Sequence, residues 1–430
     1  MMGPRLRGGH HGGVRRRPGL RLAVVELGLF IGVLGLPDGA IGVIWPSLRR
    51  TFGRPIGDLG VLVLAGTLPY LLASTLTGRG VSRHGFGPVI AVAATVSAAA
   101  LAGWAVAPVW AVAVLASGGL GLGRGAIDAG LNAYASEHEG VRRLGLLHAS
   151  YGAGATGGPL LAAVALATGT GWRAAVAVLA AVALALAVTA GQGRDAWARP
   201  AAGPAAPTTP TVAARERTYD GDPAGGSPVT IILAAFVVYT GVEAATGAWA
   251  FTACTEGRGL SPTLAGAAVA TYWGALTAGR LLLAACGHRV RRHAVLAGGA
   301  ALTVAGLVVF DVDGGAVGVS GLALTGLGLA PVFPVMVSLV PGLVGAHRAT
   351  GVIGWCIAAA GAGGPAAIAV VGILADRSGP RVVPPALLAG AIVLLGLLMT
   401  VRRLTRSPLA ESIPAARPAE RPSPERDVGH

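Results

Sequence analysis

Residues 109–134 read VWAVAVLASGGLGLGRGAIDAGLNAY, and this stretch decides the type of fold. Apolar or small side chains fill most of it, and its two charged residues are Arg124 and Asp128. A helix needs about 20 predominantly apolar residues to cross the hydrocarbon core of a bilayer. The stretch therefore predicts a transmembrane helix that carries two charges and a glycine-rich face.

The composition of the whole chain agrees with a membrane protein. Of its 430 residues, 53% are hydrophobic and only 12% are charged, whereas a soluble domain carries about 25% charged residues. These values exclude a cytosolic globular fold, a disordered scaffold and a disulfide-rich secreted domain. All basic residues are arginines that lie between apolar blocks, so the net charge of +14 does not indicate a nucleic-acid partner. The three cysteines have no metal-ligand spacing, and we expect neither a metal nor a cofactor.

Twelve apolar blocks predict an all-α membrane protein made of two six-helix halves. The predicted spans are residues 22–46, 59–77, 88–107, 109–134, 144–167, 172–192, 229–253, 265–286, 294–310, 317–340, 350–374 and 385–401. Residues 22–192 form the N-terminal half and residues 229–401 the C-terminal half. The predicted remainder is a cytoplasmic arm at 1–21, a Pro/Ala/Thr-rich cytoplasmic linker at 193–228 and a disordered cytoplasmic tail at 402–430.

The distribution of arginine predicts the orientation in the membrane. With the N-terminus in the cytoplasm, 24 arginines fall on the cytoplasmic side and 7 on the outer side, while two lie within spans. Because cytoplasmic loops carry an excess of Lys and Arg, both termini are predicted to be cytoplasmic. We expect a multi-pass protein of the plasma membrane.

Short motifs recur between the halves at offsets of 201 to 207 residues. Gly119-Leu-Gly-Leu recurs at Gly326, Gly157-Gly-Pro at Gly363, and Gly78-Arg at Gly279. Several matches in the same order at nearly one offset indicate an internal duplication. Parallel repeats of this kind are typical of transporters built from two related halves.

Four carboxylates fall inside the predicted spans, where a charge costs about 2.5–3.5 kcal/mol on insertion scales. They are Glu26, Asp38, Asp128 and Glu243. Glu26 lies within a turn of the cytoplasmic boundary, and we interpret it as an interfacial charge. Arg124, Asp128 and Asn132 are spaced by four and share one helix face. This face lines a cavity, or Arg124 and Asp128 form an ion pair that only neutralises itself.

Further polar residues lie along faces of other spans. Tyr239, Glu243 and Thr246 share a face of span seven, and Trp273, Thr277 and Arg280 a face of span eight, where Arg280 is close enough to the interface to snorkel. His148 and Tyr151 on span five could line the same cavity as Asp128, although a histidine at this end of a span is also typical of the interface. In the C-terminal half the position that matches Asp128 is Val335, so the acids are concentrated in the N-terminal half.

These residues resemble those of the major facilitator superfamily over about residues 22–401, most closely its fucose/glucose–galactose:proton symporter branch. The resemblance is carried by Gly-Ala-Ile-Asp128-Ala-Gly-Leu-Asn132, Leu147-His148-Ala-Ser-Tyr151-Gly-Ala-Gly, Tyr239-Thr-Gly-Val-Glu243 through Trp249, and Trp273-Gly-Ala-Leu-Thr-Ala-Gly-Arg280. The loop motif Gly-x-x-x-Asp-Arg-x-Gly of the superfamily appears as Gly78 to Gly85 with Ser82 in place of the acid. A closer copy, Gly372-Ile-Leu-Ala-Asp376-Arg377-Ser-Gly379, falls in the predicted outer loop after span eleven.

The resemblance implies a secondary transporter, not an enzyme, that works by alternating access. The expected substrates are protons and a small solute, with a sugar as the first candidate, and a monomer is expected. Asp128, Glu243 and Asp38 are the predicted proton-coupling residues, with Arg124 as the partner of Asp128. Predicted substrate contacts are Asn132, His148, Tyr151, Tyr239 and Trp273. One alternative is a proton-driven drug or metabolite efflux antiporter, because Gly154-x-x-x-Gly158-Pro159 on span five partly resembles the motif of such antiporters. The other is a membrane-embedded enzyme or receptor.

Overall fold

The computed structural model describes residues 18–138, 141–197, 226–286, 291–312 and 315–405, and the regular elements of these residues are helices. The N-terminal half comprises α1 (Pro18–Leu29), η1 (Phe30–Gly35), α2 (Leu36–Thr51), η2 (Ile56–Asp58), α3 (Leu59–His84), α4 (Phe86–Val106), α5 (Trp110–His138), α6 (Val141–Ala167), α7 (Gly171–Gln192) and η3 (Arg194–Ala196). The C-terminal half comprises α8 (Gly226–Thr252), η4 (Ala253–Gly257), α9 (Pro262–Cys286), α10 (Arg292–Val312), α11 (Ala316–Leu329), α12 (Val332–Val344), α13 (Ala346–Ser378), η6 (Pro380–Val382) and α14 (Val383–Leu404).

The twelve predicted spans all appear as helical segments. Among the described residues, 11 helical segments are long and apolar enough to cross a membrane, and α6 is the twelfth segment of the bundle. The predicted arm, linker and tail fall mainly on residues 1–17, 198–225 and 406–430, outside the described residues.

Prolines interrupt two of the spans. The first span runs without a gap through α1, η1 and α2, and its π-type segment η1 ends just before Pro37. Because proline lacks an amide hydrogen and its ring clashes with the preceding turn, a local widening of the helix accommodates it. In the same way Pro331 separates α11 from α12 within the tenth span. The first of these irregularities lies beside Asp38, so it sets the position of that carboxylate.

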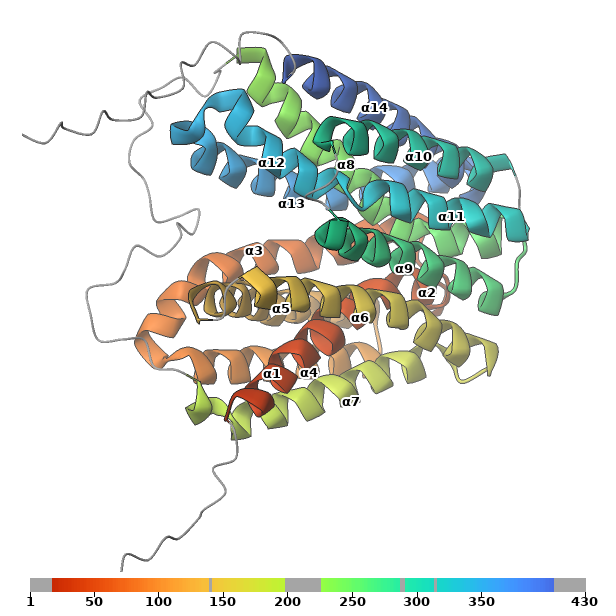
Figure 1. Cartoon of the computed structure of the whole chain (residues 1–430). Helices are drawn as coiled ribbons and strands as arrows, with labels where there is room; N and C mark the ends of the chain where they lie inside the picture. The colour runs from red at the N-terminus through yellow and green to blue at the C-terminus, as the bar shows by residue number, and fades with distance from the viewer. Residues whose placement is uncertain (1–17, 139–140, 198–225, 287–290, 313–314, 406–430) are drawn as a thin grey trace, which may run out of the picture.

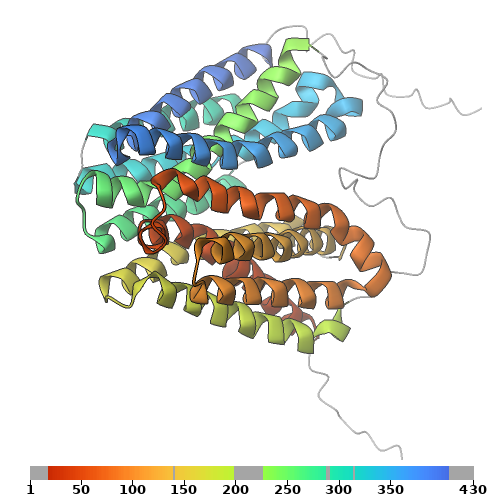
Figure 2. The same ribbon diagram turned by 180° about the vertical axis from the view of Figure 1, so that it is seen from behind.

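Two bundles of helices lie one above the other, α1 to α7 in red to yellow-green and α8 to α14 in green to blue (Figure 1), and the view from behind shows the same division (Figure 2). In the N-terminal half α2 packs on α6, α3 on α5, and α4 on α7. In the C-terminal half α8 packs on α13, α9 on α11, and α10 on α14. These are the same pairs by order of span, as an internal duplication requires.

Glycines bring the helices that carry polar residues into backbone contact. A Cβ atom on Gly35 would lie 2.3 Å from the carbonyl oxygen of Tyr151, and one on Gly125 would lie 2.2 Å from that of Tyr70. Side chains other than hydrogen cannot fit at these distances, which is why small residues mark helix contacts in membranes. The first contact places η1 and Asp38 against α6, and the second places Asp128 against α3.

The two halves meet at one end of the bundle, which holds residues 52–58, 168–170 and 258–261. We call it the outer end, because the arginine distribution predicts that it lies outside the cytoplasm. A Cβ on Gly42 of α2 would lie 2.6 Å from the carbonyl oxygen of Ala248 of α8, and one on Gly266 of α9 would lie 2.2 Å from Cβ of Ala163 of α6. Both contacts cross between the halves, so the outer end is closed in this conformation.

Candidate functional site

The first polar cluster lies in the N-terminal half, where α2, α5 and α6 meet. Arg124 donates through Nη2 to Oδ2 of Asp38 and to the carbonyl oxygen of Leu34, the latter at 3.3 Å. Tyr151 donates its hydroxyl to the same Asp38 oxygen at 3.1 Å. The cluster ties three helices together, and both charged side chains of the pair are partly exposed.

Asp128 has a different set of partners from the one expected. The sequence placed Arg124 beside Asp128 at i and i+4, but in the structure Arg124 forms its ion pair with Asp38 on another helix. Asp128 accepts hydrogen bonds from the hydroxyl of Tyr70 on α3 and from Nδ2 of Asn132, the second at 2.8 Å. The partners of the Asp128 carboxylate among the described residues are thus neutral donors. The expected coupling partnership of Arg124 with Asp128 is wrong for this conformation, because an arginine side chain is long enough to reach across a helix interface.

The second polar cluster lies in the C-terminal half between α8 and α9. Oε2 of Glu243 accepts from Nη2 of Arg280 at 2.9 Å and from the hydroxyl of Tyr239. Arg280 also donates to the Tyr239 hydroxyl at 3.1 Å, and Tyr272 donates to the backbone carbonyl of Glu243 at 2.8 Å. Arg280 therefore folds back toward an acid of its own half instead of extending to the membrane surface.

The two clusters lie close to each other across the boundary between the halves. A Cβ on Gly152 of α6 would lie 2.4 Å from Oγ1 of Thr277 on α9, one turn away from Arg280. Tyr151, next to Gly152, lies within electrostatic range of both Asp38 and Glu243. Asp38 and Glu243 also hold matching places in the two repeats, since they lie 205 residues apart, within the offsets of 201 to 207 found for the repeated motifs. The arrangement is one polar site with an acid–arginine pair on each side of it.

The predicted substrate contacts divide into accessible and buried residues. His148 is exposed, and it lies within electrostatic range of Asp128 in one half and Arg280 in the other. Asn132 and Tyr151 are partly exposed. Tyr239 is buried, and Trp273 is only 6% exposed with its ring against the backbone of Gly247. In this conformation the last two support the site from behind and offer no ring face to a solute.

Glu26 is buried within the helix bundle and forms an ion pair. It is 1% exposed, and Arg143 of α6 donates to its Oε2 through Nε at 2.9 Å and through Nη2 at 2.5 Å. Two nitrogens of one guanidinium thus bond a single carboxylate oxygen, and this pair joins α1 to α6. The sequence did not indicate this pair because the partner lies 117 residues away.

Polar contacts also join the halves at the outer end. Arg49 of α2 donates through Nη2 to Oε2 of Glu256 of η4 at 2.7 Å. Asp376, the acid of the loop-motif copy, accepts from the backbone N–H of Ile56 at 2.7 Å and of Gly57 at 2.9 Å. We call these contacts of Arg49–Glu256 and Asp376 with η2 the outer latch. Together with the glycine contacts, they hold the two halves together at the outer end.

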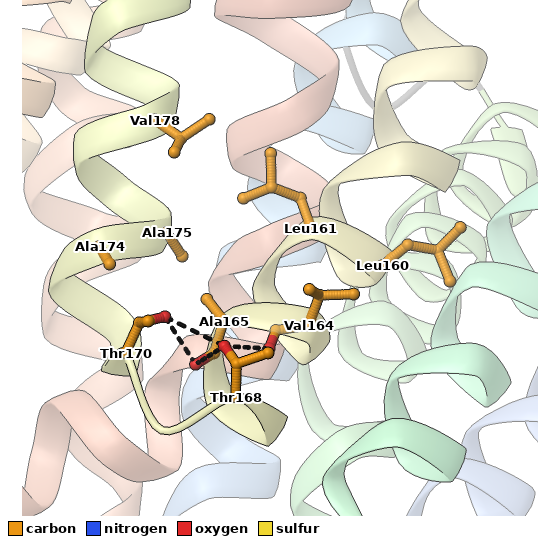
Figure 3. Close-up of a pocket in the computed structure, with 9 residues that line it drawn as sticks. All are labelled: Leu160, Leu161, Val164, Ala165, Thr168, Thr170, Ala174, Ala175 and Val178. Carbon is orange, nitrogen blue, oxygen red and sulfur yellow. Dashed lines mark hydrogen bonds between the residues drawn. The ribbon is translucent and has the colours of Figure 1, made fainter.

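An apolar groove of about 390 Å³ lies away from the polar site, between α6 and α7 near the outer end (Figure 3). Leucine, valine and alanine side chains form most of its wall. Thr168 and Thr170 at its rim bond to each other at 3.3 Å and to backbone carbonyls of α6. With its polar groups already bonded, this groove has nothing to orient a polar solute, so it is not part of the candidate site.

A sequence model described as Major Facilitator Superfamily matches residues 27–217 and 231–427, which is most of the chain and both halves of the bundle. The chain belongs to this superfamily. Its members are transporters, so this protein is a multi-pass membrane transporter and not an enzyme, as the sequence predicted. No match was found among curated protein sequences.

Solved structures with the same fold include transporters of several solutes. A nucleoside transporter superposes with a TM-score of 0.70 at 11% identity, covering 89% of this chain and 99% of that chain. A bacterial homologue of the human lysosomal transporter Spinster, in an inward-facing and unoccupied conformation, gives 0.71 at 11%, covering 91% and 98%. The fucose:proton symporter of E. coli gives 0.58 at 16%, covering 91% and 100%. At these identities the likeness shows the fold alone.

Proposed function

We propose that this protein is a proton-coupled secondary transporter that carries a small polar solute by alternating access. The observation that supports the coupling is the environment of Asp128, which is bonded to neutral donors only among the described residues. Asp128 is partly exposed within a membrane span, where an ionised carboxylate is costly unless a cation pairs with it and a hydrogen-bonded neutral carboxyl costs less. Asp38 and Glu243 already have arginine partners, so Asp128 is the acid best suited to take up and release a proton.

The polar site carries the solute in this proposal. Asn132, His148 and Tyr151 offer amide, imidazole and hydroxyl groups on the N-terminal side, and Glu243 with Arg280 faces them from the C-terminal half. The conformation described here has a closed outer latch, so solute and proton exchange with the inner side. Opening of the latch and approach of the inner ends of the halves would expose the same site to the outer side.

Uptake into proteoliposomes under an imposed pH gradient tests the proposal. The wild-type protein is expected to accumulate its solute against a concentration gradient when the lumen is alkaline. Asp128→Asn keeps the size and most of the hydrogen bonding of the side chain but cannot exchange a proton. It is expected to abolish uphill accumulation while counterflow exchange survives. Normal gradient-driven accumulation in a well-expressed Asp128→Asn protein would rule out this residue and leave Asp38 and Glu243 as candidates.

A sugar is the first candidate solute, since the motifs resemble a sugar:proton symporter branch and a structure of the E. coli fucose:proton symporter is among the similar folds. A drug or metabolite antiporter is the second candidate, and the sign of the coupling separates the two. A symporter acidifies the compartment that receives the solute, and an antiporter makes that compartment alkaline. A pH-sensitive dye in the lumen reports the difference.

A further inference from the structure

We infer that the transported solute is a small hydroxylated organic acid, such as a sugar acid, whose carboxylate binds Arg280. The inference rests on the proposed function and names its substrate class. It starts from the way Arg280 uses its donors. Both hydrogen bonds that Arg280 makes among the described residues come from Nη2 alone. A guanidinium carries five N–H donors suited to carboxylates. Nε and Nη1 of Arg280 have no hydrogen-bond partner among the described residues, so these donors are available to a ligand.

The exposed fractions of Arg280 and Glu243 agree with binding of a solute carboxylate by Arg280. The side chain of Arg280 is 36% exposed and that of its partner Glu243 is 18% exposed, so the cation is the more accessible member. Arg124 in the other half is less accessible at 20%, and its Nε is buried without a hydrogen-bond partner. Joining α8 to α9 does not require a charged pair, because Tyr272 already bonds the Glu243 carbonyl at 2.8 Å. Of the two arginines, Arg280 is therefore the one placed to meet a solute.

The aromatic residues of the site argue against a neutral sugar. Trp273 and Tyr239 are buried, and their rings offer no stacking face in this conformation. Without stacking on these two rings, hydrogen bonds to hydroxyl groups are exchanged for bonds to water at little net gain. A carboxylate on Arg280 supplies the missing attraction, since charge-assisted hydrogen bonds are about twice as strong as neutral ones. Asn132, His148 and Tyr151 then bind the hydroxyl groups from the opposite half.

The charges of the site link the organic anion to the proton. Asp38 balances Arg124 and Glu243 balances Arg280, and His148 is taken as neutral. With Asp128 ionised and no solute, the site has a net charge of −1. When Asp128 takes up one proton and one monovalent anion binds Arg280, the net charge is again −1. Binding of the anion alone would bring the net charge of the site to −2, which is costly in a membrane, and uptake of a proton by Asp128 avoids this cost. Proton and anion are therefore expected to enter together, one of each, with no net charge moved across the bilayer.

Matched substrate pairs test the inference, because each pair has nearly the same hydroxyl groups and differs in charge. The full-length protein in liposomes with an alkaline lumen is offered labelled galacturonate or galactose, and glucuronate or glucose. We expect the acid of at least one pair to enter at least about tenfold faster than its parent sugar, as the loss of a charged contact implies. A valinomycin-imposed potassium potential should leave that rate unchanged. A parent sugar that enters as fast as its acid, or entry of neither member, would overturn the inference. Proton-coupled uptake of a neutral sugar or another solute would still leave the proposed function intact.

Variants separate solute binding by Arg280 from a purely structural pair. Arg280→Gln leaves Glu243 without its cation and could unfold the protein, so it is combined with Glu243→Gln, which removes both charges. The double variant is expected to fold, to lose the thermal stabilisation by the acid, and to bind the acid at least about tenfold more weakly. Restored acid uptake in the folded double variant would show that the pair is only structural and would overturn the inference. Arg291→Gln, an exposed arginine just before α10, is the control.

Discussion

Weakening the outer latch is expected to shift the protein toward a conformation that opens at the outer end. The variant combines Glu256→Gln with Asp376→Asn. Glu256 accepts from Arg49 at 2.7 Å, and Asp376 accepts two backbone N–H groups of η2. Each contact joins one half to the other, and separation of the outer ends must break both. The substitutions therefore raise the energy of the closed outer end and leave each half intact.

The change in the equilibrium between the two conformations can be estimated from the exposed fractions of the side chains in the outer latch. The side chains of Arg49 and Glu256 are 19% and 18% exposed, so their pair lies between a surface ion pair and a buried one. We take about 1.5 kcal/mol for its loss. Asparagine at 376 keeps one acceptor oxygen, so about one hydrogen bond is lost there, worth ~1 kcal/mol. Together they amount to ~2.5 kcal/mol, or roughly a 60-fold change in the equilibrium between the two conformations.

Pulsed dipolar EPR can measure this equilibrium. Spin labels on Arg50 of α2 and Thr263 of α9, both exposed at the outer end on opposite halves, report the distance between the halves. The three native cysteines are replaced first, since Cys286 is exposed. The variant should gain a population at longer distance. Asp195→Asn, which removes an exposed carboxylate from the inner end, is the control. An unchanged distance distribution in the latch variant would refute the assignment of these contacts to the closure of the outer end.

Three further predictions concern packing, the buried ion pair and topology. Gly125→Val should lower the thermal unfolding temperature or abolish expression, because a Cβ there would lie 2.2 Å from the Tyr70 carbonyl oxygen; Gly145→Val, in open space on α6, should not. Glu26→Gln should destabilise the protein by about 3 kcal/mol in a thermal or denaturant assay, since the Arg143 guanidinium loses a buried carboxylate. Wild-type stability would show that this pair contributes little. Cysteine at Asp311 should react with an impermeant maleimide from outside and cysteine at Arg291 only from inside. Reversed labelling would overturn the orientation.

The sequence predicted the spans and the repeat because both depend on properties that are local in the chain. Apolar length decides which segments cross a bilayer, and recurrence of Gly119-Leu-Gly-Leu at Gly326 needs no knowledge of contacts. The shared face of Asp128 and Asn132 was also predictable, since the i, i+4 spacing of a helix fixes it. The structure confirms this face, in which Asn132 bonds Asp128.

Partners on other helices were not predictable from these patterns. Tyr70 bonds Asp128 and Arg143 bonds Glu26, yet nothing near these two residues in the sequence indicates a polar site. Tyr272 precedes the predicted contact Trp273, but its bond to the Glu243 carbonyl was not predicted. Their roles depend on which helices touch, and that is set by glycines such as Gly125, whose partner Tyr70 belongs to another span. The nearest signal was the abundance of glycine around Arg124 and Asp128, which predicted a close helix contact without naming the helix.

The two halves of the duplication each carry an acid–arginine pair, but only the N-terminal half carries an acid at the position of Asp128. Asp38 and Glu243 hold matching places, and each binds an arginine of its own half, so both halves carry a neutral polar pair. The position that matches Asp128 is Val335, a buried residue in α12 just after the break at Pro331. If Asp128 is the proton site that we propose, its presence in one half only implies one proton for each cycle. The arginine partners do not match, because Arg124 lies on the fourth span and Arg280 on the eighth, which corresponds to the second. Asp128, whose hydrogen-bond partners among the described residues are neutral, provides the coupling that we propose.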